Sequence, residues 1–146
     1  MSTTFTLRRS RPDELDWVNA RYAEIDFVAS KPGDVIAVAE ANGQVAGLGR
    51  VVQVDEGVGE LGGMLVFDAY RGSGLSKQII GFLQQQAGLP TLYCLPFAEL
   101  EGLYCSMGFA HANAADTVPS AVAAKHRWCN AFYPKPVLLL VARAGR

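Results

Sequence analysis

The spacing of hydrophobic and polar positions predicts a strand and a helix at the start of the chain. Residues 4–8 alternate polar and apolar side chains, as an edge strand does, and residues 12–22 repeat apolar side chains with a helical period. Pro12 is typical of a first helical turn, and Ser10 is the candidate cap. Residues 25–33 mix apolar side chains with Pro and Gly, which predicts a loop whose apolar side chains need not be core if a substrate covers them.

Two apolar runs on either side of Asn42-Gly43 predict a β-hairpin. The runs span residues 35–40 and 44–53, and the Asn-Gly dipeptide supplies the positive φ angles of a tight turn. Residues 59–67 predict the next strand.

The second half of the chain alternates between helical and strand patterns. They predict a helix over residues 75–86, a strand over 91–95, a helix over 97–105 and a buried final strand over 137–142. The stretch from Asn113 to Pro136 follows no clear period, although Ser120 is placed to cap a short helix. Antiparallel strands followed by a strand–helix–strand unit predict an α+β fold, in a single domain over residues 1–146.

Composition favours a compact domain without a broad charged surface. Half of the 146 residues are hydrophobic, and the formal net charge is −1 with no run of basic residues. A chain of this length buries a sizeable core, and the lack of a basic patch disfavours nucleic-acid binding. Residues 1–6 contain no apolar signal segment, and no apolar run approaches the roughly 20 residues of a membrane span. We therefore expect a cytoplasmic protein that binds neither nucleic acid nor a membrane.

The cysteines are odd in number and lack the spacing of a zinc site: Cys94, Cys105 and Cys129. This pattern predicts reduced, mostly buried thiols and no bound metal. Neither Cys94 nor Cys105 has a nearby His or Lys in the sequence, which disfavours a nucleophilic role. His111 and His126 have no partner at ligand spacing, and we expect them at the surface.

The turn that follows the strand ending at residue 67 has the composition of a phosphate-binding loop. Gly72 and Gly74 are interleaved with the small residues Ser73 and Ser76, and a helix begins directly after the turn. Small residues let the backbone approach a ligand, and the first N–H groups of the helix point at that ligand from the positive end of the helix dipole. The segment therefore predicts an anion site.

Two familiar phosphate loops do not fit the spacing of this turn. A dinucleotide fingerprint has a third glycine where this chain has Lys77, and no acidic residue ends a second strand about 20 residues later. A nucleotide P-loop has Gly-Lys-Ser/Thr at the start of the helix, and this chain does not. Both alternatives are disfavoured.

The pattern Arg71-x-x-Gly74-x-Ser76 resembles the acetyl-CoA loop of the GCN5-related N-acetyltransferase (GNAT) family, which reads Gln/Arg-x-x-Gly-x-Gly/Ala. Ser76 departs from the family's glycine or alanine and places a hydroxyl beside the diphosphate. Downstream, residues 103–109 (LYCSMGF) resemble the family's Phe/Leu-Tyr-x-x-x-Gly-Phe segment. The resemblance implies the GNAT fold, a mixed and mostly antiparallel central sheet with flanking helices, and acetyl-CoA as the cosubstrate.

The resemblance also implies which residues bind acetyl-CoA. Those in the loop and at the helix start are Arg71, Gly72, Ser73, Gly74, Leu75 and Ser76, and the backbone donors on the preceding strand are Leu65 and Val66. The neighbouring Gly62 and Gly63 favour a bulge that frees an N–H for the thioester carbonyl. Ordinary close packing of the strand is the alternative reason for these two glycines.

Acetyl transfer to an amine needs a base for the amine and an acid for the departing thiol. Tyr104 matches the family's tyrosine and is the implied acid, although a tyrosine ring in the core with its hydroxyl at the surface is the alternative. Glu60 lies on the strand that resembles the one bearing a catalytic glutamate in many family members, and it is the candidate base. Strand alternation predicts Glu60, Gly62, Met64 and Val66 on one face. A solvated acid at a strand end is the alternative for Glu60. Glu24 and Asp26 are the other candidates, either for the base or for holding a cationic acceptor.

Two functions from different classes fit these residues. The first is acetyl transfer from acetyl-CoA directly to the amine of a small molecule or peptide, and the second is a non-catalytic acyl-CoA-binding sensor or interaction module. Trp17, Tyr22 and Phe27 either line an acceptor pocket or form core. By analogy with the family, the late region over residues 113–136 lies near the acceptor pocket or a dimer surface. A second copy of the chain is the possible protein partner, in a homodimer that pairs through the C-terminal strand.

Overall fold

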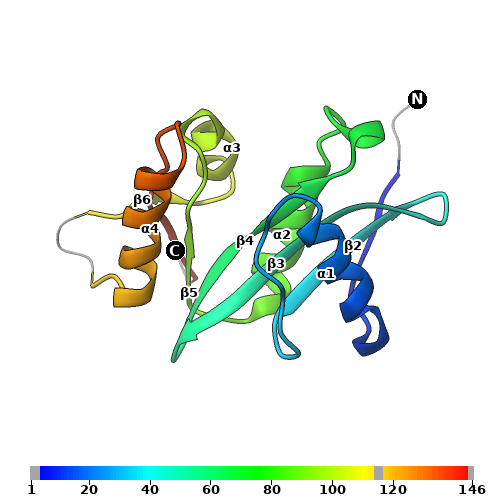
Figure 1. Ribbon diagram of the computed structural model, residues 1–146, viewed down its shortest axis with the longest axis horizontal. Coiled ribbons are helices and arrows are strands. Elements are labelled where there is room, and N and C mark those ends of the chain that lie inside the picture. Colours follow the sequence, from blue (N-terminus) through cyan, green and yellow to red (C-terminus); the bar gives the residue numbers. More distant parts are fainter. Residues whose placement is uncertain (1–3, 114–116, 145–146) are drawn as a thin grey trace.

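The structure is a computed structural model that describes residues 4–113 and 117–144. Residues 114–116 of the stretch that followed no clear period therefore lie outside the described residues. At the centre is a seven-stranded sheet in the order β1-β2-β3-β4-β5-β7-β6 (Figure 1). Its strands are β1 (Thr6–Arg9), β2 (Val35–Ala41), β3 (Gln44–Asp55), β4 (Val58–Val66), β5 (Thr91–Cys94), β6 (Ala110–His111) and β7 (Leu140–Arg143).

The described helices lie on both faces of this sheet. They are α1 (Leu15–Ala23), α2 (Leu75–Ala87), α3 (Glu101–Cys105) and α4 (Ser120–Phe132), with 3₁₀ turns η1 (Pro12–Glu14), η2 (Asp68–Tyr70) and η3 (Ala98–Leu100). Strands β4 and β5 pair in parallel and the other neighbours pair antiparallel. The predicted α+β fold with a mixed, mostly antiparallel sheet is confirmed.

Strands β2 and β3 form the predicted hairpin. Asn42 and Gly43 have φ angles of 52° and 77°, as the tight turn requires. The edge position of β1 is also confirmed, because β1 pairs with β2 at one end of the sheet.

Alternation along the strands divides the two faces of the sheet between different helices. Ala37 of β2 lies in the core cluster that includes Ile79 of α2, whereas the next residue, Val38, packs with Tyr22 of α1. Side chains at successive positions of a strand point to opposite faces. Helices α1 and α2 therefore cover opposite faces of the sheet.

Helix α4 covers the α1 face at the other end of the sheet. Val122 of α4 packs with Tyr93 of β5 and Val141 of β7, whereas Leu92, the neighbour of Tyr93, packs in the α2 cluster. Figure 1 shows α1 and α4 over opposite ends of the sheet, with β4 between them in the strand order. The strand β4 thus lies between two helices that share one face.

Helix α2 packs tightly against β3 because β3 has glycines where the helix crosses it. A Cβ atom on Gly49 would lie 2.6 Å from Cγ2 of Ile79, and one on Gly47 would lie 3.1 Å from Cδ1 of the same side chain. Such approaches are not tolerated in a close-packed core. The two glycines therefore set the position of α2, and with it the turn that leads into α2.

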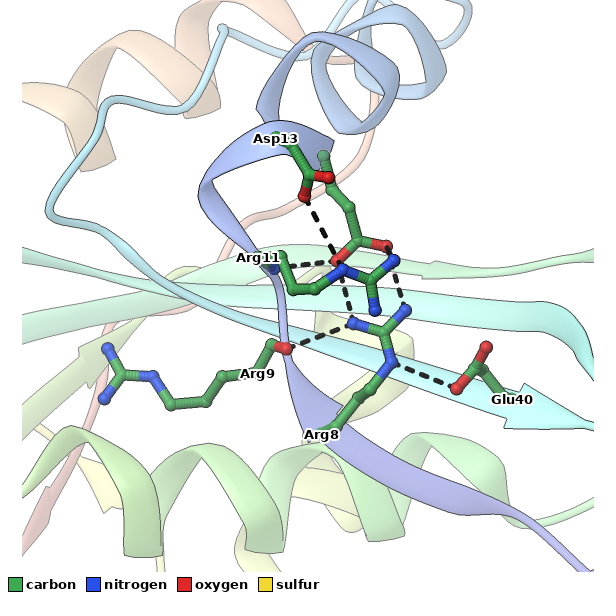
Figure 2. A network of polar contacts seen from close by, with 6 residues as sticks. Arg8, Arg9, Arg11, Asp13 and Glu40 are labelled. Atoms are coloured by element: carbon green, nitrogen blue, oxygen red, sulfur yellow. Dashed lines mark hydrogen bonds and ion pairs between the residues drawn. The ribbon is translucent and has the colours of Figure 1, made fainter.

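A polar network joins β1, the start of α1 and β2. The Arg8 guanidinium donates to Glu14 at 2.8 Å and to Glu40 at 3.0 Å, and Figure 2 shows Arg8 together with Arg11 and Glu40 in this network. The predicted cap at Ser10 is wrong, because Arg11 occupies the cap position of η1. Glu14 accepts instead from the backbone N–H of Arg11 at 2.7 Å, which satisfies a donor at the start of the helical segment.

The end of the chain differs from the sequence prediction in several ways. Helix α4 has 13 residues rather than being short, and Ser120 is its first residue, with Pro119 in the cap position. Strand β7 begins at Leu140 rather than at Val137, because the Asn130 side chain bonds both the N–H and the carbonyl of Val137. The short strand β6 was not predicted at all.

Burial confirms the expectation of mostly buried thiols and corrects the expectation for one histidine. Cys94 and Cys129 are buried as expected, but Cys105 is exposed near the end of α3. His126 is partly buried and bonds to the Val137 carbonyl at 2.8 Å, whereas His111 lies at the surface as expected. Among the described residues, no helix combines the length and the apolar character needed to cross a membrane.

Candidate functional site

Strands β4 and β5 separate part of the way along β4. Their parallel pairing runs from Val58 opposite Thr91 to Leu61 opposite Cys94 and goes no further. Residues 62–66 of β4 continue without a partner in β5. Backbone N–H and C=O groups on this side of β4 are therefore left for a ligand or for water.

A bulge lies at the point where the two strands separate. On the β3 side, the step from Leu48 to Arg50 covers two residues, whereas the paired step on β4 from Leu65 to Gly62 covers three. Gly63, inside the bulge, has a φ of 59°. The bulge that the two glycines favoured is confirmed.

Close packing also requires glycine at position 63. The bulge and the close packing of the strand therefore both explain Gly63. A Cβ atom on Gly63 would lie 2.8 Å from the Tyr22 hydroxyl and 3.0 Å from Nε of Arg50. The Tyr22 hydroxyl donates to the Gly63 carbonyl at 2.8 Å. Tyr22 is fully buried, which raises its pKa and keeps the hydroxyl as a donor. The bulge is thereby held from the α1 face.

The turn before α2 has an open, glycine-dependent backbone. Gly72 and Gly74 have φ angles of 77° and 83°, and a Cβ atom on either would meet no protein atom within 4 Å. Glycine is required here for the left-handed conformation, not for contact with another part of the protein. Gly74 occupies the cap position of α2, and no side chain bonds to the first turn of the helix. The N–H groups of that turn are free to meet an anion.

A cavity of about 280 Å³ lies over this turn. Its lining comes from the strand end, the turn and α3: Val66, Tyr70, Arg71, Gly72, Ser73, Gly74, Leu75, Ser76, Lys77 and Leu103. The Arg71 side chain is largely exposed and pairs with Asp68 at 3.1 Å, and Lys77 adds a second cation to the lining. The donors and the open space fit a diphosphate group, which is the part of coenzyme A that the turn was expected to bind.

The candidate acid, Tyr104, is buried beside Cys94. Its side chain is 4% exposed, and its ring packs edge-on against Phe109 with the centroids 5.8 Å apart. The hydroxyl is within hydrogen-bonding reach of the Cys94 thiol, at the last residue of β5 before the strands separate. Burial raises the pKa of both Tyr104 and Cys94. Both groups are therefore protonated at neutral pH.

The candidate base, Glu60, forms an ion pair with α4. Its Oε2 atom lies 2.6 Å from Nζ of Lys125, and the Glu60 side chain is only 13% exposed. The alternative of a solvated acid at a strand end is therefore wrong. Glu60 lies on the face of the sheet that α4 covers, with Oε2 3.8 Å from the position of a Cβ on Gly62. The carboxylate is thus directed along β4 toward the bulge.

A buried cation on β3 lies on the other side of the bulge. Arg50 is 8% exposed, and its Nη1 donates to the Val28 carbonyl and to the Ser30 hydroxyl, each at 2.7 Å. Its guanidinium lies 4.7 Å from the centroid of the Tyr22 ring. These bonds tie the loop after α1 to the sheet beside the bulge.

The remaining candidates lie away from this centre or in the core. Glu24 pairs with Arg21 at 3.0 Å, and Asp26 is exposed in the turn after α1. Of the three aromatic candidates, Tyr22 is core, Phe27 is partly buried against the same cluster, and Trp17 is 38% exposed. Within residues 4–113 and 117–144, no cluster of potential ligands suits a metal ion.

Sequence reasoning did not find Arg50, Lys125 or the contact between Tyr104 and Cys94. A charged residue within the apolar run of residues 45–52 was a usable signal for Arg50. Lys125 and Glu60 are 65 positions apart in the chain, and nothing in the local pattern links them.

Comparisons with known proteins agree with this geometry. Residues 32–111 match a family model described as an acetyltransferase (GNAT) domain. No curated protein matches the sequence.

Several solved structures share the fold at low sequence identity. N-acetylglutamate synthase from Neisseria gonorrhoeae, in complex with coenzyme A and L-arginine, superposes with a TM-score of 0.71 at 16% identity over 100% of this chain, which spans only 34% of that protein. Ribosomal-protein-S18-alanine N-acetyltransferase from Escherichia coli has a TM-score of 0.69 at 16% identity, with 98% of this chain and 96% of that chain covered. A protein from Bacillus anthracis, in complex with acetyl coenzyme A, has a TM-score of 0.65 at 13% identity over 98% and 99% of the two chains.

Proposed function

Because the chain belongs to the acetyltransferase (GNAT) family, we propose that it transfers the acetyl group of acetyl-CoA directly to the amine of a small molecule or peptide. The observation that carries this proposal is the course of β4. One strand leads from the Glu60 carboxylate, through the bulge at Gly63, to the open turn before α2. In this proposal the base lies just before the unpaired edge of β4, and the diphosphate site lies beyond the end of that edge.

The residues of the turn and of β4 hold the cosubstrate in this proposal. Acetyl-CoA supplies the activated acetyl group as a thioester. The first-turn N–H groups after Gly74 bind its diphosphate, with Arg71 and Lys77 nearby. The backbone of residues 62–66, including Leu65 and Val66, binds the rest of the carrier along the unpaired edge.

Tyr104 acts as the general acid in this proposal. The departing sulfur needs a proton, and the Tyr104 phenol carries one at neutral pH because burial raises its pKa. Its position beside Cys94, where β4 and β5 separate, supports the assignment. The bulge supplies the N–H donor for the carbonyl oxygen, on which negative charge develops.

Glu60 acts as the general base and takes the proton of the attacking amine. Its carboxylate lies on the face between α1 and α4, is largely shielded from water and already binds one ammonium group, that of Lys125. A carboxylate within hydrogen-bonding reach of an amine is the geometry that proton abstraction requires. Direct transfer is favoured over a cysteine intermediate, because burial raises the pKa of Cys94 and keeps the thiol protonated.

Two measurements test the proposal against the non-catalytic alternative. Thermal shift with acetyl-CoA reports binding, and release of free thiol with a panel of amines reports turnover. We expect stabilisation by acetyl-CoA and amine-dependent thiol release above the rate of hydrolysis. Stabilisation without thiol release for any amine favours the sensor or interaction module, and no stabilisation at millimolar acetyl-CoA contradicts both functions.

A further inference from the structure

One lysine of the chain is bonded to the proposed catalytic base. The sequence contains four lysines, at positions 31, 77, 125 and 135. Nζ of Lys125 lies 2.6 Å from Oε2 of Glu60, which is the contact that an acceptor amine would have to make. The Lys125 side chain is 51% exposed, whereas that of Glu60 is 13% exposed. A primary amine of the protein itself therefore occupies the place of the acceptor.

The surroundings of this amine are those of the acetyl-transfer centre. Oε2 of Glu60 lies 3.8 Å from the position of a Cβ on Gly62, at the start of the bulge. Glu60 lies opposite Tyr93, and its neighbour Leu61 lies opposite Cys94, the last paired residue of β5. The Lys125–Glu60 pair on the α4 face and the Tyr104–Cys94 contact on the α2 face therefore lie on the two sides of the sheet at the point where β4 and β5 separate.

The Lys125 pair differs from an ordinary surface ion pair, because Lys125 neutralises a carboxylate that is largely shielded from water. A pair between two exposed side chains contributes little to the free energy of unfolding, because water screens the charges and long side chains must be ordered. Lys135 shows the ordinary case: its Nζ lies 2.8 Å from Glu99, and both side chains are more than half exposed. The Lys125 pair differs from it in being directed to the unpaired edge of β4.

We propose that Lys125 is itself an acetyl acceptor, so that the chain acetylates its own α4. This inference rests on the proposed function. The ammonium gives one proton to Glu60, and the neutral amine attacks the carbonyl carbon of the thioester. An N–C bond forms as the C–S bond breaks. The departing sulfur takes one proton from Tyr104, and the nitrogen loses a second proton, which makes up for the proton that Tyr104 gave. The products are one amide on Lys125, free coenzyme A thiol and one proton released to water.

Acetylation of Lys125 would release the Glu60 carboxylate for an external acceptor amine. The amide is neutral, so the ion pair with Glu60 is lost and the carboxylate is left to bind a different amine. Until then, an external acceptor must displace the Lys125 ammonium from Glu60. We therefore expect external amines to slow the labelling of Lys125 in proportion to how well they serve as acceptors.

Mass spectrometry of the full chain after incubation with acetyl-CoA tests the proposal. The acetyl groups are located by peptide mapping, and Lys135 is the matched control because it is also ion-paired and lies three residues after the end of α4. We expect Lys125 to be labelled at least about tenfold faster than Lys135, since it is held at the reacting centre. The first-order rate at Lys125 should not depend on protein concentration. Equal rates at the two lysines, or a rate that rises with protein concentration, overturn the proposal.

Two variants separate this proposal from failure of the proposed function. Lys125→Arg keeps a cation opposite Glu60 and should remove the label while leaving the melting temperature within a few degrees of the parent. Glu60→Gln keeps the lysine and should slow its labelling to the rate of Lys135. If amines release thiol but Lys125 is not labelled, this inference fails alone. If the chain neither binds acetyl-CoA nor releases thiol, both fail.

Discussion

Burial determines what the single residues at the centre of the site can do. Tyr104 and Cys94 have raised pKa values because both are buried, so each retains its proton at neutral pH. Glu60 is shielded from water and paired with the Lys125 ammonium at 2.6 Å. A proton donor and a proton acceptor therefore coexist at the point where β4 and β5 separate.

Replacing Tyr104 by Phe removes the proposed acid and keeps the ring that packs against Phe109. We expect kcat for thiol release to fall about 100-fold with little change in the KM for acetyl-CoA. Tyr93→Phe is the control, because its hydroxyl bonds to the Thr117 carbonyl at 3.4 Å on the α4 face, away from Cys94. A Tyr104→Phe variant with the parent kcat removes the phenol from the mechanism.

Replacing Glu60 by Gln tests the base through the pH dependence of the reaction. With acceptor saturating, we expect the rising limb of the pH–rate profile to flatten and kcat at neutral pH to fall about 100-fold. Glu99→Gln is matched to it, because it also breaks one ion pair with a lysine, at the surface. An unchanged rising limb in Glu60→Gln would show that another group takes the proton.

At the level of elements, the two ends of α2 provide a comparison within one helix. Gly74 before the helix and Gly88 after it both have positive φ angles, 83° and 62°, and a Cβ on either meets no protein atom within 4 Å. The backbone cost of placing alanine there is therefore similar, at about 1 kcal/mol. The two positions differ in their distance from the proposed diphosphate site, because the cavity lies over the turn at the start of the helix.

Gly74→Ala should weaken acetyl-CoA binding at least about tenfold, because it strains the turn and adds a methyl group where the first N–H groups meet the anion. Gly88→Ala should lower stability by a similar amount and leave acetyl-CoA binding unchanged. Isothermal titration calorimetry with coenzyme A and thermal denaturation of both variants provide the comparison. Equal affinities in the two variants would place the diphosphate elsewhere.

The predicted helix before the final strand gained a role that its sequence did not indicate. Helix α4 brings Lys125 to Glu60 on one side, while His126 and Asn130 hold Val137 on the other. Lys125 belongs to residues 113–136, which the analogy placed near the acceptor, and that placement stays a prediction. The homodimer stays a prediction, and its expected route changes, because β6 rather than β7 is the edge strand.

For the whole molecule, the network around Arg8 joins elements that are distant in the chain. Hydrogen bonds from the Arg8 guanidinium lower the pKa of Glu14 from 4.5 to about 2 (Figure 2). A carboxylate with a lowered folded-state pKa stabilises the fold fully above its unfolded value. This stabilisation is lost as the pH falls from 4.5 toward 2.

Glu14→Gln should remove this contribution, which we expect to be about 1–2 kcal/mol at pH 7 because both partners are partly solvated. The difference in unfolding free energy between the parent and the variant should shrink toward zero near pH 2. Denaturant unfolding at several pH values measures it, with Glu99→Gln as the surface control. A difference that is constant with pH would rule out the ion pair as its source.

The sequence determined the parts of this protein whose causes are local. Asn42-Gly43 specifies the hairpin because of its φ angles, and Gly72 and Gly74 specify the open turn for the same reason. Strand alternation put Glu60 and Gly62 on one face correctly, but the bulge at Gly63 moves Met64 and Val66, predicted on that same face, to the α2 face. The turn and Tyr104 together indicated the family. Each of these features depends on neighbours within a few positions in the chain.

The tertiary structure decided what depends on contacts between distant segments. Whether Glu60 is solvated or paired depends on which face α4 packs against, and α4 is about 60 residues further along the chain. The separation of β4 from β5, the placement of Tyr104 beside Cys94 and the burial of Arg50 likewise follow from packing of the whole sheet. Local periodicity does not encode such pairings, because each of them is set by the balance of burial over the complete core.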